Sequence, residues 1–121
     1  VVLACALTDE TRFLFNRKRF ASMRSDSYLV NIARGEVVDQ EALLEALASG
    51  QIAGAATDVT YPEPLPEGHP MWNEPRLIIT PHTADTLPQV TRMFSERLRV
   101  NVSVWFTGGQ LTGIVDKALG Y

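Results

Sequence analysis

Short apolar runs alternate along this chain with polar segments that carry helix signals. The runs are rich in aliphatic and small residues, as buried strands of parallel sheets are, and they cover residues 1–6, 27–33, 52–59 and 77–80. Side chains that can cap a helix stand between the runs at Thr8, Asn16 and Asp39, and Gly50 offers a stop for the helix after Asp39. The alternation predicts a parallel α/β sheet with right-handed crossovers.

The segment between the third and fourth runs has a different character. Residues 61–75 hold most of the chain's 7 prolines, and this composition predicts a loop rather than regular structure. On composition alone the loop could be no more than a long crossover. Met71 and Trp72 are expected to anchor it to the core.

A long amphipathic helix is expected after the fourth run. It should begin near Thr86, with Pro88 in its first turn, and end at Gly108-Gly109. Its apolar stripe must bury against another surface and consists of Val90, Met93, Phe94, Leu98, Val104 and Trp105.

Composition and charge narrow the function classes. Hydrophobic residues make up 45% and charged residues 21% of the 121 residues, as in one small globular domain. A net charge of -3 gives no sign of a nucleic-acid partner, and no stretch is apolar enough to span a membrane. Cys5 is the single cysteine, so an internal disulfide is excluded. No Cys/His spacing suits a structural zinc, so no metal site is expected. A reducing, cytoplasmic setting is the default expectation. Five basic residues cluster in the first part of the chain, and we expect them to form the solvated face of one helix and its flanks. They are Arg12, Arg17, Lys18, Arg19 and Arg24.

Polar side chains follow three of the predicted strands, at the point where each strand ends. These are Arg34, then Asp58 with Glu63, and finally His82. The carboxyl ends of parallel strands open onto one crevice where ligands bind, so these side chains should lie together. Arginine can grip a carboxylate, and a histidine held by a glutamate can move a proton near neutral pH. The combination suits reduction of a keto acid or oxidation of a hydroxy acid.

Each of these residues also has a plainer interpretation. Arg34 could close a strand end and bond to helix carbonyls, and Glu63 could be a solvated loop acid. His82 could cap a helix, and Asp58 could be an ordinary acid at a strand end. His69 is interpreted as a loop histidine that packs or contacts solvent.

Taken in order, the motifs resemble those of the D-isomer-specific 2-hydroxyacid dehydrogenases, a family that includes phosphoglycerate, glyoxylate/hydroxypyruvate and D-lactate dehydrogenases. The resemblance runs from Val1 to about Thr107, with a weaker echo at Val115-Asp116 and Gly120-Tyr121. The matching motifs are Leu7-Thr8-x-x-Thr11, Asn31-x-Ala33-Arg34-Gly35-x-x-Val38-Asp39-x-x-Ala42-Leu43, Ala53-Gly54-Ala55-Ala56-x-Asp58-Val59, Glu63-Pro64-Leu65-Pro66, His69-Pro70-Met71-Trp72 and Thr80-Pro81-His82-x-Ala84.

The resemblance implies roles for these residues. Arg34, Glu63 and His82 would be the catalytic set, and Asp58 would meet the carboxamide of the nicotinamide. The family uses NAD or NADP, acts on small 2-oxo or 2-hydroxy acids and is typically a homodimer, with no nucleic-acid or membrane partner. The dinucleotide groove would be lined by Cys5, Ile32, Ala33, Arg34, Asp58, His82 and Ala84.

The resemblance also implies a domain organisation. Residues 1–107 would be the C-terminal part of an NAD(P)-binding domain, the second half of a doubly wound (Rossmann) sheet with flanking helices, and residues 108–121 a tail toward a substrate domain. The family's glycine-rich dinucleotide fingerprint is absent from the sequence, so the 121 residues alone are expected to be inactive. An alternative of the same fold is a non-catalytic dinucleotide-sensing module, such as a co-repressor.

Three positions depart from the family pattern. Ala6 stands where the family usually has proline, and Thr57 stands where it has leucine. Both should be tolerated, because the family uses backbone or packing there. Asp85 replaces a glycine or small residue and adds a negative charge near the histidine.

Overall fold

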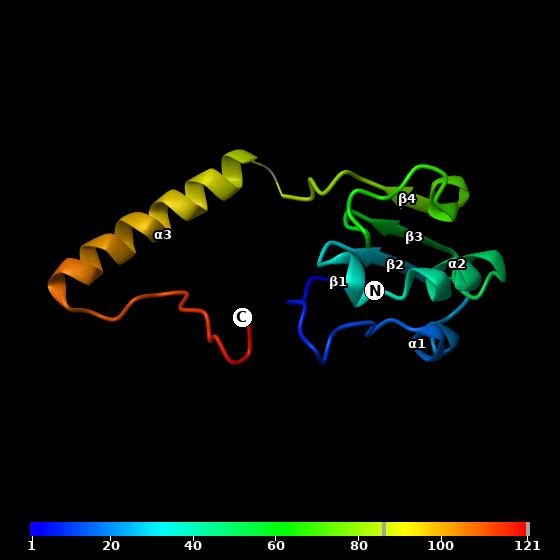
Figure 1. The fold of residues 1–121 in the computed structure, drawn as a ribbon, viewed down its shortest axis with the longest axis horizontal. Coiled ribbons are helices and arrows are strands. Elements are labelled where there is room, and N and C mark those ends of the chain that lie inside the picture. The colour runs from blue at the N-terminus through cyan, green and yellow to red at the C-terminus, as the bar shows by residue number, and fades with distance from the viewer. Residues whose placement is uncertain (86, 121) are drawn as a thin grey trace. The chain divides into compact units, whose positions relative to one another are not determined.

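The computed structural model describes residues 1–85 and 87–120, which divide into the units Val1–Ala84 and Asp85–Tyr121. In the first unit, four parallel strands lie side by side in the order β1-β2-β3-β4 (Figure 1). The strands are β1 (Val2–Leu3), β2 (Tyr28–Asn31), β3 (Gly54–Thr57) and β4 (Leu77–Ile79). The predicted parallel α/β sheet is confirmed.

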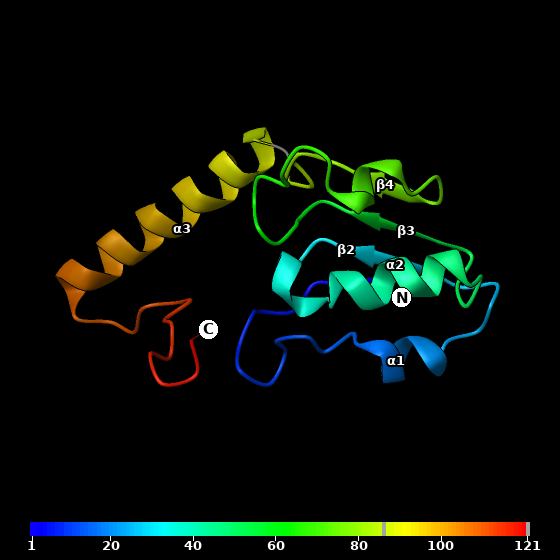
Figure 2. The same ribbon diagram turned by 45° about the vertical axis from the view of Figure 1, so that its right-hand side comes forward.

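Two helices of the first unit pack against each other and against the sheet (Figure 2). They are α1 (Arg17–Ala21) and α2 (Gln40–Ala48). Both begin at the predicted capping residues, since the side chain of Asn16 accepts from Arg19 N and that of Asp39 from Ala42 N. The buried side chains that join the helices to the sheet include Phe20, Leu29, Leu43 and Leu47.

The sheet of the first unit buries one face and exposes the other. Leu3 and Leu29 point to the buried face and are 5% and 1% exposed. Their neighbours Val2 and Tyr28 point the opposite way and are 64% and 62% exposed, as is Ile78 on β4 at 66%. Within this unit, α1 and α2 therefore cover one face of the sheet.

The strands are shorter than the apolar runs predicted. β2 ends at Asn31 because the side chain of that residue forms a turn, accepting from Ala33 N and donating to the carbonyl of Arg34. Beyond Leu3 the chain leaves the sheet, so only Val2 and Leu3 form β1.

No helix follows Thr8, contrary to the capping signal there. The Thr11 hydroxyl donates to the carbonyl of Ala6 and accepts from Thr8 N, and such local bonds compete with a helix. Phe13 then has a φ of 50°, and Phe15 pairs with Val38 as an isolated parallel bridge. The segment is therefore a hydrogen-bonded turn that leads into an extended stretch.

The proline-rich loop contains a short 3₁₀ helix, η2 (Pro70–Asn73). Met71 is 2% exposed and anchors the loop to the core, as expected. Trp72 does not: it is 53% exposed, and its indole donates to the carbonyl of Pro66 within the same loop at 2.9 Å. His69 caps η2 by accepting from Met71 N.

The second unit consists of α3 (Leu87–Thr107) and the segment after it. Gly108 ends the helix with a φ of 73°, as predicted, whereas the predicted start at Thr86 lies outside the described residues. The side chain of Asn101 holds the following segment by donating to the carbonyl of Thr112 and accepting from its N–H. No helix among the described residues has the length and apolar character that crossing a membrane requires.

The boundary between the two units follows Ala84, so α3 clusters with the C-terminal segment. The prediction that residues 1–107 belong to one nucleotide-binding domain and residues 108–121 to a tail stays a prediction.

Candidate active site

The residues singled out in the sequence stand at one edge of the first unit's sheet. Cys5 follows β1, and Ile32, Ala33 and Arg34 follow β2. Asp58 and Glu63 follow β3, while His82 and Ala84 follow β4. Because all four strands are parallel, these positions share the carboxyl edge of the sheet, as expected.

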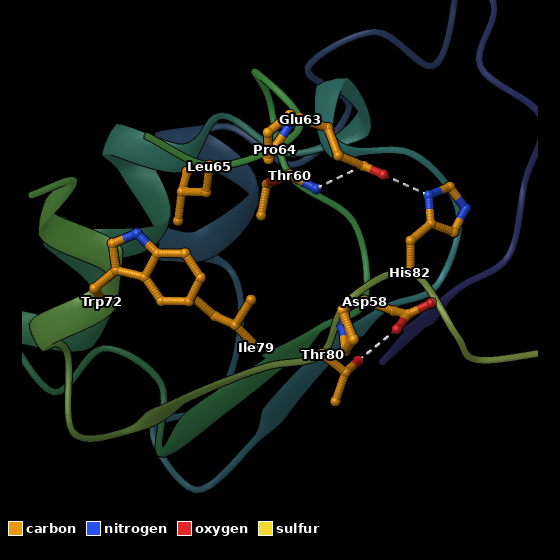
Figure 3. Close-up of a pocket in the computed structure, with 10 residues that line it drawn as sticks. Asp58, Thr60, Glu63, Pro64, Leu65, Trp72, Ile79, Thr80 and His82 are labelled. Atoms are coloured by element: carbon orange, nitrogen blue, oxygen red, sulfur yellow. Dashed lines mark hydrogen bonds and ion pairs between the residues drawn. The ribbon is translucent and has the colours of Figure 1, made fainter. Parts of the chain in front are cut away.

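Glu63 and His82 are joined directly. Nδ1 of His82 lies 2.6 Å from Oε1 of Glu63, and the two side chains are 44% and 42% exposed (Figure 3). The bond from His82 is the largest cause that holds the pKa of Glu63 below its usual value; burial opposes it, and Thr60 N–H and the charges of His82 and Arg34 reinforce it. An ionised carboxylate can only accept, so Nδ1 carries the hydrogen and Nε2 is left for another partner.

Asp58 fixes the backbone on either side of His82. It is 5% exposed, and its Oδ1 accepts from the Thr80 hydroxyl and from Thr83 N at 2.9 Å. Its Oδ2 accepts from Ala84 N at 2.8 Å. Burial alone would raise the pKa of Asp58, but these bonds and the nearby charge of His82 outweigh it and lower the pKa.

His82 adopts a backbone conformation that residues other than glycine seldom adopt. Its φ is 55°, in the left-handed region, and such a conformation persists only where the surroundings enforce it. The carboxylate of Asp58 supplies that enforcement, since it binds Thr80, Thr83 and Ala84 on both sides of the histidine. Two restraints therefore position the imidazole: the backbone conformation of His82 and the bond between Nδ1 and Glu63.

Arg34 lies near this pair without touching it. Its Nη1 donates to the carbonyl of Ala33 at 2.7 Å, and none of the ion pairs between the described residues includes it. Its charge nevertheless contributes to the lowered pKa of Glu63. Arg34 as a whole is an exposed residue at the carboxyl edge of the sheet.

A cleft of about 630 Å³ opens beside Glu63 and His82 (Figure 3). One side is polar and the other is apolar, where Leu65, Trp72 and Ile79 come together. Its full lining is Asp58, Thr60, Glu63, Pro64, Leu65, Trp72, Ile79, Thr80, Pro81 and His82. Glu63 and His82 therefore line this cleft, and Arg34 does not.

The sequence did not reveal how the site is supported. Thr80 was visible only as part of a motif, and its bond to Asp58 joins residues 22 positions apart. Thr60, whose N–H donates to Oε2 of Glu63, carried no signal of its own. Thr57, the departure from the family pattern, is buried and satisfied, because its hydroxyl donates to the carbonyl of Val59.

The described residues contain no cluster of three or more His, Cys, Asp or Glu side chains that could hold a metal ion.

Comparison with known proteins gives one consistent result. Residues 1–84 match the family model described as the NAD binding domain of D-isomer specific 2-hydroxyacid dehydrogenases. Glyoxylate/hydroxypyruvate reductase A of Serratia proteamaculans is 42% identical over 115 residues, covering 94% of this chain and 36% of that protein.

Solved structures agree with this match. The chain resembles a D-isomer specific 2-hydroxyacid dehydrogenase from Xanthobacter autotrophicus, solved with NADPH and MES, with a TM-score of 0.89 and 39% identity over 100% of this chain and 49% of that one. It also resembles an NADPH-dependent glyoxylate/hydroxypyruvate reductase from Sinorhizobium meliloti, solved with NADP and sulfate, with a TM-score of 0.90 and 30% identity over 99% of this chain and 39% of that one. The chain therefore spans less than half the length of each of these proteins.

Proposed function

The chain belongs to the D-isomer-specific 2-hydroxyacid dehydrogenases, and from that premise we propose that the intact protein containing it is an NAD(P)-dependent oxidoreductase. It would transfer a hydride between the cofactor and C2 of a small D-2-hydroxy acid or the matching 2-oxo acid. Glyoxylate and hydroxypyruvate are the first substrates to test, because two of the similar proteins named above are described as glyoxylate/hydroxypyruvate reductases. The homodimer implied by the family resemblance stays a prediction.

One observation carries the proposal. Nδ1 of His82 is bound to the ionised carboxylate of Glu63, and the backbone of His82 is held in a left-handed conformation by Asp58. A histidine positioned in this way can use Nε2 as an acid or a base near neutral pH.

Each residue would have a separate role in the reaction. The nicotinamide cofactor, when bound, supplies or accepts the hydride. Arg34 would hold the substrate carboxylate, because a guanidinium can offer two donors at once. In reduction, Nε2 of His82 would give its proton to the carbonyl oxygen, and in oxidation it would take that proton back. Glu63 would keep the imidazole oriented and balance its positive charge.

The chemistry of Asp58 fits a nicotinamide carboxamide. An ionised carboxylate has about four acceptor positions, and the three bonds to Asp58 leave room on Oδ2 for a further amide N–H. Ile32 and Ala84, which follow β2 and β4, are exposed along the same edge, whereas Ala33 is 5% exposed and would take part only through its backbone. These contacts to a dinucleotide are part of the proposal.

The test is replacement of His82 in the intact protein. His82→Ala should lower the turnover of 2-oxo acids with NADH or NADPH by roughly a hundredfold to ten-thousandfold, because the proton donor is lost. Dinucleotide affinity, measured by calorimetry, should change little. The matched control is His69→Ala, which removes the chain's other histidine, a residue that caps η2 in the proline-rich loop.

Two results would contradict the proposal. Turnover that survives in His82→Ala would remove the acid/base assignment. Dinucleotide binding by the unmodified protein without turnover of any 2-oxo acid would instead favour the non-catalytic sensor.

A further inference from the structure

Gln40, the first residue of α2, reaches across to the loop that carries Glu63. Its amide oxygen accepts from Tyr61 N at 2.9 Å, and its amide nitrogen donates to the carbonyl of the same residue. The side chain thus satisfies both backbone groups of Tyr61, as a neighbouring strand would. The loop is tied to the N-terminal end of α2 at a single residue, two positions before Glu63.

The backbone next to this contact is also closely packed. A Cβ added to Gly35 would lie 2.2 Å from the carbonyl carbon of Thr60 and 2.7 Å from Tyr61 N. Gly35 begins η1 (Gly35–Val37), the turn between β2 and α2, and Arg34 precedes it directly. In Figures 1 and 2 this cyan turn lies beside the green loop that follows β3. The turn that presents Arg34 and the loop that presents Glu63 are therefore in backbone contact.

The contacts continue from Tyr61 to the imidazole. Thr60 N donates to Oε2 of Glu63, and the Thr60 hydroxyl donates to the carbonyl of Pro62. Oε1 of Glu63 is bound to Nδ1 of His82. Movement of the backbone at residues 60–61 would therefore change the position of the carboxylate that orients the histidine.

We propose that Gln40 is a positioning residue for Glu63. By bonding to both backbone groups of Tyr61, it fixes the position of the Glu63 carboxylate relative to His82 and to Arg34. Gln40 touches neither the substrate nor the reacting atoms in this scheme. The inference rests on the proposed function, because it concerns the efficiency of the same proton transfer. The inference adds a role for α2. Through Gln40 and the preceding turn η1, α2 would fix the position of Glu63 and His82 relative to Arg34.

The experiment is a double-mutant cycle in the intact protein. Gln40→Ala alone should lower kcat by about fivefold to fiftyfold, since small errors in the placement of catalytic groups are costly, and should leave the KM for the dinucleotide unchanged. In a Glu63→Gln background the same replacement should lower kcat by less than about twofold, because the carboxylate that it positions has already gone. Gln40→Glu keeps the acceptor for Tyr61 N but loses the donor, so its kcat should lie between those of Gln40→Ala and the unmodified protein.

The matched control is Gln51→Ala. The Gln51 side chain also donates to a backbone carbonyl, that of Met23 at 3.0 Å, but it lies beyond the C-terminal end of α2. This variant should lose stability to a similar extent in thermal unfolding without the loss of kcat.

The possible failures are distinguishable. Equal losses of kcat from Gln40→Ala in the presence and absence of Glu63, or no loss at all, would overturn this inference and leave the proposed function standing. An unchanged kcat in Glu63→Gln alone would overturn this inference together with the role of Glu63, whereas no turnover by the unmodified protein would overturn the proposed function.

Discussion

A buried carboxylate is stable only when donors surround it, and Asp58 shows how that requirement is met here. The side chain is 5% exposed, yet its pKa lies below the usual value. Burial raises that pKa, and the bonds from the Thr80 hydroxyl and from two backbone N–H groups lower it by more. All three donors belong to the segment around His82, so ionised Asp58 and the backbone conformation of His82 stabilise each other.

This arrangement predicts a stability that depends on acid. A group with a depressed folded-state pKa contributes stability above its unfolded pKa, about 4 for an aspartate, and loses it as the pH falls through the folded value. Asp58→Asn should be less stable at neutral pH by about 1–3 kcal/mol, because its amide group would face N–H donors. The variant should also lose less stability than the unmodified protein below about pH 4. Denaturant unfolding at a series of pH values measures both effects.

The control for this prediction is Asp26→Asn. Asp26 also has a lowered pKa, owing to its bond with Arg24, but the pair is exposed on the surface and should contribute little to stability. If the free energy of unfolding changed with pH in the same way for the unmodified protein and Asp58→Asn, the bonds of Asp58 would not stabilise the segment around His82.

At the scale of single residues, the sequence predicted positions better than contacts. Arg34, Asp58 and His82 could be placed at one edge because each follows an apolar run that forms a strand. Thr80 and Gln40 could not be identified, because their partners Asp58 and Tyr61 are distant in the sequence. No local pattern marks a bond of that kind.

At the scale of elements, the site depends on a close approach between a turn and a loop. Gly35 has an ordinary φ in η1, so its turn does not require glycine for conformational reasons. The requirement comes from space, since a Cβ at this position would overlap the backbone of Thr60. The dipeptide Arg34-Gly35 therefore combines a candidate anion-binding side chain with the one residue type that lets the Glu63 loop approach it.

Gly35→Ala should accordingly disturb stability and turnover together. The loop backbone must shift, which should cost about 1–3 kcal/mol of unfolding free energy, as overpacking usually does. The shift should also weaken the hold of Glu63 on His82 and lower kcat. Thermal unfolding and steady-state assays of the intact protein measure the two effects.

The matched control is Gly50→Ala, where φ is 72° but no atom lies within 4 Å of the added Cβ. That variant should lose stability through backbone strain and keep its kcat, and unaltered stability in Gly35→Ala would contradict the close approach.

Local signals predicted the elements where no distant segment competed with them. Asn16 and Asp39 cap α1 and α2 as expected, because capping depends on residues within one turn. Thr8 gave a similar signal and no helix formed, because the Thr11 hydroxyl bonds locally and because Phe13 and Phe15 bond to the backbone of η1. The sequence held no sign of that pairing.

At the scale of the whole molecule, the first unit holds the charged residues of the candidate site but leaves one face of its sheet exposed. Val2, Tyr28 and Ile78 lie on that face. The sequence contains no glycine-rich dinucleotide fingerprint, which in doubly wound folds joins a strand to the helix N-terminus that receives the pyrophosphate. The proteins that the chain resembles are more than twice its length, since it spans 36% and 39% of two of them.

The 121 residues expressed alone should therefore bind dinucleotides weakly and show no turnover of 2-oxo acids. The proton-transfer pair would be present, but neither the pyrophosphate nor the far side of the substrate would meet a complementary surface, so the reactants would not be held in position. Calorimetry with NADH and NADPH and a turnover assay, each run beside the intact protein, measure the two properties. Turnover by the purified chain comparable to that of the intact protein would contradict this prediction, because it would show that Arg34, Glu63 and His82 need no residues outside the 121.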